Sequence, residues 1–234
     1  MKNIMKYFFK INTVFLTICF LIALLGNEVS SDETVFKQKS EREYPLAGID
    51  NVEVDEEYVY CYSQYFQAVN VYDKNGVFQY SITVPGSTNG KGYMYRWNGY
   101  LCIKSNLSGD VYQYKNGEFV YRVIYEEDGE HIKVLDSNDQ IIKTDVVTDE
   151  IVGYWDGKVF VADSIEDEIL VSNSVVEDEN EDTYSIGLLR PRLIKNNETI
   201  VKGSMVKILC SSPILTFVCI FLNEMLLRLL IRKG

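Results

Sequence analysis

Hydrophobic and polar residues follow three distinct patterns along the 234-residue chain. One uncharged, largely apolar run covers residues 14–26, and a second covers residues 208–222. Between about residues 47 and 201, short runs of alternating apolar and polar residues are separated by Gly, Asn and Asp. Alternation with a period of two is typical of half-buried strands, whereas long uncharged runs are typical of helices in an apolar environment. The pattern predicts an all-β domain flanked by N- and C-terminal hydrophobic helices.

The N-terminal run follows three spaced lysines and precedes the polar sequence NEVSSDE, which is the layout of a secretory signal. Val29 and Ser31 are the small residues that would precede a cleavage site. Lengthened by the upstream sequence YFFKINT, the same run also suits an uncleaved signal anchor. Both interpretations make residues 1–31 an export element, and the sequence leaves its removal open.

The C-terminal run predicts a transmembrane helix over residues 205–234, ending in a short basic segment. Glu224, Arg228 and Arg232 recur every four residues, so they share one helical face that suits lipid headgroups. Pro213 is expected to kink the helix without breaking it, because membrane helices tolerate proline. These four residues are the candidates for helix–helix or interfacial contacts in the membrane.

Basic residues near both apolar runs predict the topology of the chain. Cytoplasmic segments next to membrane helices carry an excess of Lys and Arg. Lysines precede the first run, and the second run is followed by Arg228, Arg232 and Lys233. We therefore expect a cell-membrane protein with both ends in the cytoplasm and residues 32–204 on the extracytoplasmic side. Residues 32–46 are expected to be a linker and residues 47–203 the β domain.

The β domain is predicted to contain at least ten strands rich in tyrosine and β-branched residues, which favour pleated, half-buried surfaces. The expected strands cover residues 58–63, 68–73, 77–84, 92–97, 100–105, 110–115, 119–125, 140–147, 158–163 and 168–173.

The domain also repeats itself with a period of 41 residues. NVYDKNGVFQY, from Asn70 to Tyr80, is followed by DVYQYKNGEFVY, from Asp110 to Tyr121. The same shift places Cys61 on Cys102. A fixed period near 40 residues indicates a repeated supersecondary unit, here a meander of about four strands. The Asn-Gly pairs are expected to supply the positive φ angles of tight two-residue hairpin turns.

Later segments continue this pattern less regularly. DGKVFVADS at residues 156–164 occupies the place of NGYLCIKSN at residues 98–106, and IKVLDSNDQIIK at residues 132–143 has the form of another hairpin. Together with VNVYDKNGVF and DVYQYKNGEF, these sequences resemble the blades of NHL-type and six-bladed β-propellers. The resemblance implies a β-propeller-like fold of repeated four-stranded meanders. The domain has room for at most about four such units, which implies a ring that is small, open or incomplete.

Net charge limits the functions open to the chain. The chain carries 34 acidic and 23 basic residues, a net charge of −11, and both of its ends are basic. The acidic residues therefore concentrate in the β domain, which would repel phosphate backbones, so no nucleic-acid partner is expected.

Residues able to hold a metal ion or act as nucleophiles are few. The single histidine, His131, lies in the polar sequence EEDGEHIK, and the cysteines form no C-x-x-C pair, so we expect no metal, cofactor or catalytic residues. The acidic tract at residues 175–184 lacks the ligand spacing of a calcium loop and is interpreted as a solvated loop. Whether Cys61 and Cys102 form a disulfide stays open, although equivalent positions on neighbouring blades would lie too far apart.

Aromatic residues crowd the first two units, and the sequence places Arg96 and Trp97 next to a turn. Tyrosine and tryptophan give rigid contact area for protein or carbohydrate ligands, so Tyr95, Arg96 and Trp97 are the candidate binding surface. The predicted function is a membrane-tethered, non-catalytic binding or scaffold module. Two alternatives remain: a degenerate propeller enzyme, or an accessory subunit of a membrane complex that acts through its C-terminal helix.

Overall fold

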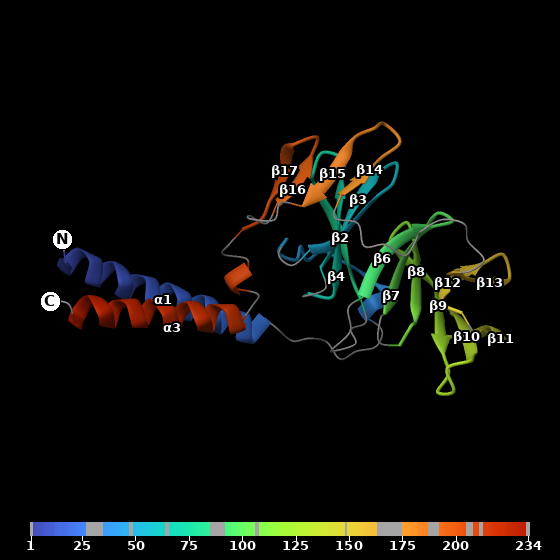
Figure 1. Ribbon diagram of the computed structural model, residues 1–234, viewed down its shortest axis with the longest axis horizontal. Coiled ribbons are helices and arrows are strands. Elements are labelled where there is room, and N and C mark those ends of the chain that lie inside the picture. The colour runs from blue at the N-terminus through green and yellow to red at the C-terminus, as the bar shows by residue number, and fades with distance from the viewer. Residues whose placement is uncertain are drawn as a thin grey trace. The chain divides into compact units, whose positions relative to one another are not determined.

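The computed structural model describes residues 2–26, 35–46, 49–63, 66–84, 92–105, 108–147, 149–162, 175–186, 192–204, 208–210 and 213–232. The chain divides into two compact units (Figure 1). A helical unit comprises Met1–Ser31 and Gly203–Gly234, and a β unit comprises Asp32–Lys202. The predicted strand at residues 168–173 lies outside the described residues.

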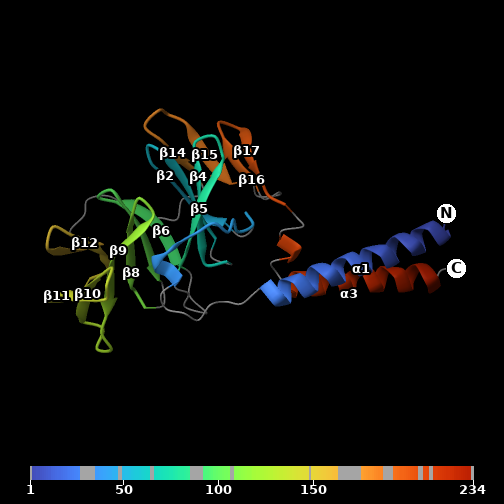
Figure 2. The same ribbon diagram turned by 180° about the vertical axis from the view of Figure 1, so that it is seen from behind.

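The helical unit is an antiparallel pair formed by α1 (Lys2–Gly26) and α3 (Pro213–Arg232) (Figures 1 and 2). Within α1, the segment Ile4–Ala23 is long and apolar enough to cross a membrane, with a mean hydropathy of 1.5. A signal sequence meets the same criterion, so this helix fits both export interpretations. Pro213 is the first residue of α3, where its missing N–H leaves no helical hydrogen bond unmade. Residues 211–212 lie outside the described residues, so the expected kink at Pro213 stays a prediction.

The first two sheets of the β unit are antiparallel and follow the chain order closely. Sheet A has the strand order β1-β5-β4-β3-β2, and sheet B has the order β11-β10-β9-β8-β7-β6. Their strands are β1 (Lys39–Ser40), β2 (Ile49–Val54), β3 (Tyr58–Ser63), β4 (Ala68–Asp73), β5 (Phe78–Thr83), β6 (Gly92–Trp97), β7 (Tyr100–Ser105), β8 (Val111–Lys115), β9 (Glu118–Tyr125), β10 (His131–Asp136) and β11 (Ile141–Val146).

Two smaller antiparallel sheets follow. Sheet C is the hairpin β12-β13, and sheet D is the meander β14-β15-β16-β17. In the described residues none of the four sheets closes on itself. The strands are β12 (Ile151–Trp155), β13 (Lys158–Val161), β14 (Val175–Glu177), β15 (Thr183–Ile186), β16 (Arg192–Lys195) and β17 (Glu198–Lys202).

Three apolar clusters pack the sheets face to face in the order D, A, B, C (Figures 1 and 2). The cluster between D and A includes Tyr72, Tyr184 and Leu193. A larger cluster joins A to B, and the third joins B to C. Sheets A and B are therefore covered on both faces, which explains why their strands contain long runs of buried residues. The expected mostly-β architecture is present, and its assignment to the propellers stays a prediction.

The segment expected to be a linker is part of the β unit. Phe36 is buried, with its ring 4.9 Å from that of Phe119 and 5.4 Å from that of Tyr112. Lys39 and Ser40 form β1 on the edge of sheet A. Residues 32–46 were expected to be a linker, but one buried aromatic ring and one short strand attach the described residues 35–46 to the core.

Three hairpins are closed by the same aspartate-capped turn. In each, the first aspartate accepts hydrogen bonds from the N–H groups two and four residues later. Its own N–H donates to the carbonyl four residues later. The residue three positions later has a positive φ of 61° or 84°. These turns are Asp73–Val77, Asp136–Gln140 and Asp178–Asp182, so the acidic tract at residues 175–184 is a hairpin.

The two Lys-Asn-Gly sequences of the repeat form different turns. Asn116 and Gly117 have φ angles of 53° and 75° and close the tight turn that was expected between β8 and β9. In the equivalent β4–β5 turn only Gly76 has a positive φ, of 84°, because the carboxylate of Asp73 organises a longer loop. The repeat therefore preserves the hairpin and not the turn type.

Candidate functional site

A polar cleft of about 660 Å³ opens on the β unit, lined by residues of sheets A, B and D. Six carboxylates line it, against two basic side chains, Lys39 and Arg96. We call it the acidic cleft. Its carboxylates are Asp55, Glu56, Glu57, Glu177, Asp178 and Glu179.

The first wall of the acidic cleft is the turn between β2 and β3. Asp55 accepts hydrogen bonds from the N–H groups of Glu57 (2.9 Å) and Tyr58 (2.7 Å) through Oδ1. Its Oδ2 accepts a third hydrogen bond from the Tyr60 hydroxyl, at 2.7 Å. An aspartate that accepts backbone N–H groups two and three residues later fixes such a turn. Asp55 therefore determines where the neighbouring Glu56 and Glu57 are presented, and both are exposed.

Arg96 reaches the same carboxylate from sheet B. Its Nη1 lies 2.6 Å from Oδ2 of Asp55, and about a quarter of each side chain is exposed. Burial lowers the pKa of Arg96, while the negative charge of Glu53 opposes that shift. The ion pair links β6 to the β2–β3 turn, so one side of the cleft is held by contacts between two sheets.

Two tyrosines from sheet A form an aromatic wall. The rings of Tyr58 and Tyr80 pack edge to face with centroids 6.2 Å apart. Lys39 Nζ lies 4.7 Å from the Tyr80 ring centroid, which is within cation–π range. Burial, together with the nearby Tyr58, raises the pKa of Tyr80 to about 12. The Tyr80 phenol therefore offers neutral surface to a ligand at physiological pH.

The third wall is the turn between β14 and β15 in sheet D. Asp178 Oδ2 accepts a hydrogen bond from Lys74 Nζ at 2.7 Å, which joins this turn to sheet A. Burial alone would raise the pKa of Asp178, but Lys74 and the N–H groups of Asn180 and Asp182 together lower it. Glu177 and Glu179 flank this anchored aspartate and are exposed. The acidic cleft thus combines two anchored aspartates with four exposed glutamates.

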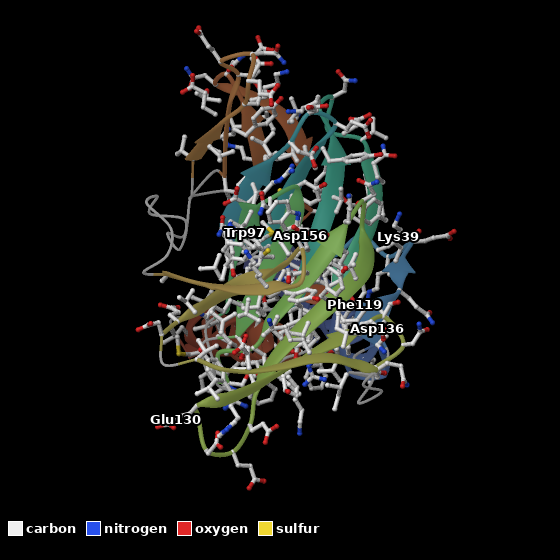
Figure 3. All side chains as sticks on the ribbon, turned by 90° about the vertical axis from the view of Figure 1, so that its right-hand side faces the viewer. Lys39, Trp97, Phe119, Glu130, Asp136 and Asp156 are labelled. Atoms are coloured by element: carbon white, nitrogen blue, oxygen red, sulfur yellow. The ribbon has the colours of Figure 1, made fainter. Side chains whose placement is uncertain are left out.

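Of the candidate binding residues, the structure brings only Arg96 to the acidic cleft. Strand alternation turns Tyr95 and Trp97 to the opposite face of β6, toward sheet C. Tyr95 is 1% exposed and donates a 2.6 Å hydrogen bond to the carbonyl of Val152. Trp97 is 8% exposed, with its ring 5.1 Å from that of Phe160, and it lies among the sheets in Figure 3. Tyr95 and Trp97 are core residues, so the expected three-residue surface reduces to Arg96.

The candidate membrane residues are separated in α3. Glu224 accepts a 3.0 Å hydrogen bond from Thr13 of α1, so it lies at a helix–helix contact within the chain. Arg228 is exposed. Pro213 begins the helix and Arg232 ends it, but their side chains lie outside the described residues.

His131 and Cys61 fill structural positions. His131 Nδ1 lies 2.5 Å from Oδ2 of Asp128, in the turn between β9 and β10, and both side chains are about half exposed. Cys61 faces sheet D and Cys102 faces sheet C, and the two thiols are free and buried. Among the described residues, no group of three His, Cys, Asp or Glu side chains is placed to hold a metal ion.

One sequence signal for the acidic cleft was overlooked. Asp55, Glu56 and Glu57 stand between an alternating segment and the strand YVYCYS. An aspartate at the start of a short acidic link between two strands is a turn signal. The contribution of Glu177 and Glu179 could not be foreseen, because sheet D returns to sheet A only in the folded chain.

Comparisons with known proteins assign the chain to no family. No family model matches it, and no curated protein matches it significantly. One similar solved structure is a protein of unknown function from Bacteroides caccae, at 8% identity and a TM-score of 0.26 over 67% of this chain. Another is an inferred exported protein from Bacteroides fragilis NCTC 9343, at 13% identity and a TM-score of 0.31 over 74% of this chain. The chain covers 61% and 56% of those two proteins.

Proposed function

We propose that the chain is a membrane-tethered, extracytoplasmic, propeller-like binding module whose acidic cleft takes a cationic segment of a protein partner. The acidic cleft carries this proposal. It gathers six carboxylates, of which Asp55 and Asp178 are paired with Arg96 and Lys74, while the glutamates face solvent. A concave surface of one charge sign raises the local concentration of oppositely charged ligands and speeds their association.

The aromatic wall adds to this preference. Tyr58 and Tyr80 present phenol rings in the same cleft as the glutamates. A lysine or arginine side chain on the ligand can lie over such a ring while its charge meets a carboxylate. Lys39 already lies over the Tyr80 ring. The cleft therefore supports recognition of an extended basic peptide better than recognition of an anion.

The propeller assignment is supported by repetition in both sequence and packing. Sheets A and B each contain a four-stranded meander, and sheet D is another. Adjacent sheets stack through apolar faces, as propeller blades do. In this proposal the module is an open or incomplete ring, which accommodates about four blades.

A peptide-binding measurement tests the proposal. Full-length protein in lipid nanodiscs is titrated into a fluorescein-labelled oligolysine peptide, and anisotropy is recorded at low and high salt. We expect binding that weakens as salt rises, because exposed charges are screened within about 10 Å at 0.1 M. The substitutions Glu56→Gln, Glu57→Gln and Glu179→Gln together should weaken binding at least about tenfold.

A matched variant controls for net charge. Glu118, Glu127 and Glu130 are exposed, and none of them lines the cleft. Changing these three residues to Gln alters the net charge equally and should leave the affinity within about twofold. Equal losses in both triple variants would show that binding reports only overall charge. Binding of neutral oligosaccharides in place of oligolysine would support the carbohydrate alternative instead.

A further inference from the structure

The helix pair α1 and α3 places its apolar and polar residues in the opposite way from a water-soluble helix pair. Their outward faces are apolar, with Ile4 74%, Phe8 65% and Phe217 60% exposed. Their inward faces carry polar and small residues, including Asn223 at 5% and Ala23 at 0% exposure. In water this arrangement would expose the apolar residues and bury the polar ones, whereas in hydrocarbon both faces meet a suitable environment.

The inward polar residues form one hydrogen-bonded network. Asn12 Nδ2 donates to Asn223 Oδ1 at 2.8 Å. Asn223 Nδ2 donates to the carbonyl of Phe9 at 2.9 Å and lies 2.7 Å from Thr13 Oγ1. The hydroxyl of Thr13 is also 3.0 Å from a carboxylate oxygen of Glu224. Each side-chain amide therefore has its partner on the other helix.

Small side chains permit the close approach that this network requires. Cys19 and Ala23 of α1 are buried, as is Thr216 of α3. The thiols of Cys19 and Cys210 lie close to each other. Small residues at a helix contact, combined with interhelical hydrogen bonds, are the usual basis of helix association in membranes.

From these contacts we infer that α1 is not removed as a signal peptide but persists as a second transmembrane helix, paired with α3 inside the membrane. Removal of α1 would leave Asn223 and Glu224 facing hydrocarbon without the partners that they have here. Polar side chains without partners are costly in that environment. This inference concerns the anchor alone and holds whatever ligand the acidic cleft takes.

The antiparallel arrangement agrees with the charges at the two ends. Asn12 meets Asn223 and Phe20 meets Phe217, so the start of α1 lies beside the end of α3. The basic residues at the start of α1 and those at the end of α3 then reach the same membrane face, as the positive-inside rule requires. The end of α1 and the start of α3 then reach the opposite membrane face.

The first test is the N-terminus of the mature protein. Full-length chain carrying a C-terminal affinity tag is purified from membranes, and its intact mass is measured. We expect the mass of the whole 26.9 kDa chain plus the tag. A product that begins near residue 32 would show cleavage and overturn the inference.

The second test is oxidative cross-linking between α1 and the segment at residues 208–210, which precedes α3. A protease site inserted after Gly157, in an exposed turn with open space around the glycine, lets the chain be cut between α1 and α3. After copper-phenanthroline oxidation in membranes, a Cys19–Cys210 disulfide should hold both fragments together on a non-reducing denaturing gel. Cys19→Ala should abolish this linkage, and Cys219→Ala should leave it intact. Separate fragments from unsubstituted protein that has kept α1, as its intact mass shows, would contradict the pairing.

A third experiment tests whether the hydrogen-bonded network, and not the closeness of the two helices alone, holds the pair together. Asn223→Leu removes the amide that contacts Asn12 and Thr13. Leu222→Val changes its exposed neighbour and leaves the network intact. The cross-linking rate should fall several-fold with Asn223→Leu and stay unchanged with Leu222→Val. Equal rates in both variants would show that the polar network does not hold the pair.

Discussion

Gly117, in the turn between β8 and β9, lies directly against the phenol ring of Tyr80 in sheet A. Gly76, its counterpart in the sequence repeat, lies against the backbone of Ile200 in sheet D, where an added Cβ would come within 2.7 Å of the carbonyl oxygen. Each glycine thus docks a hairpin of one sheet on the next sheet in the stack. The repeat conserves a contact between sheets as well as a hairpin.

Replacing Gly117 with Ala should destabilise the β unit by about 3 kcal/mol. A residue with a Cβ is strained at a φ of 75°, and the added methyl group would overlap the Tyr80 ring. Gly99→Ala is the matched control, because Gly99 has the same φ with nothing within 4 Å of its Cβ position. We expect the control to cost about 1 kcal/mol. Urea unfolding followed by tryptophan fluorescence measures both, and equal losses would refute the docking role.

Two substitutions of Asp55 separate its charge from its turn hydrogen bonds. Asp55→Asn keeps an oxygen acceptor for the N–H groups of Glu57 and Tyr58 but removes the charge opposite Arg96. It should cost about 1 to 2 kcal/mol, since a partly buried guanidinium loses its counter-charge. Asp55→Ala removes both contributions and should cost about 3 kcal/mol. Equal effects in urea unfolding would mean that the turn hydrogen bonds contribute nothing.

The three aspartate-capped turns should contribute unequally to the stability of the β unit, although they make the same hydrogen bonds. Asp73→Ala should destabilise the β unit by about 2 kcal/mol, because its turn docks on sheet D through Gly76. Asp136→Ala should cost less than about 1 kcal/mol, because the hairpin that it closes ends in the exposed edge strand β11. Chemical unfolding of both variants checks the order, and a larger loss from Asp136→Ala would contradict it.

The single histidine permits a direct titration. The Asp128 carboxylate, by hydrogen bonding and charge, raises the pKa of His131 above its ordinary value of 6.5. The N–H groups of His131 and Glu130, helped by the imidazole, lower the pKa of Asp128 to about 2. Any stabilisation from a raised histidine pKa is complete below pH 6.5 and disappears as the pH rises through the folded-state pKa.

Asp128→Asn should therefore return the pKa of His131 toward 6.5, as measured from the imidazole proton shifts by NMR. The contribution of Asp128 has the opposite sign. It is present above pH 3.8 and is lost as the pH falls toward 2. An unchanged histidine titration in the variant would show that the pair does not form in solution.

Cys61 and Cys102 should remain reduced and unreactive in the folded protein. Burial raises the pKa of both thiols, so little thiolate is available for alkylation. Intact mass after iodoacetamide treatment should show neither residue modified in the native state. Both should be modified after denaturation without a reductant. Protection in the denatured, unreduced chain would reveal a disulfide and contradict their places in separate clusters.

The strands of sheets A and B were largely predictable, because alternation and turn residues coincide there. β3, β4, β6 and β7 begin and end at the expected residues. β2 was missed because its sequence, IDNVEV, mixes acidic and apolar residues. Its polar residues Asn51 and Glu53 are nevertheless buried, and Asn51 donates a hydrogen bond to the carbonyl of Met94 in sheet B. Sheet D was missed because its strands are only three to five residues long, too short to show a period.

The candidate site was less predictable than the strands. A tyrosine and a tryptophan on one face of β6 look the same in sequence whether that face meets solvent or another sheet. Sheet C covers that face, so Tyr95 and Trp97 became core residues and only Arg96 reached a cleft. The polar network between α1 and α3 was also hidden, because Asn12 and Asn223 are 211 residues apart and neither is unusual by itself.

The pairing of α1 with α3 joins the two ends of the β unit as a cross-link would. While the helices remain paired in the membrane, an unfolded β unit is a closed loop and has fewer conformations than a free chain. For a loop of this length, a permanent link would remove about 5 kcal/mol of unfolded-state entropy. The helix pair would then stabilise the fold by restricting the unfolded chain, and the same β unit released from the helix pair would unfold at lower denaturant concentrations.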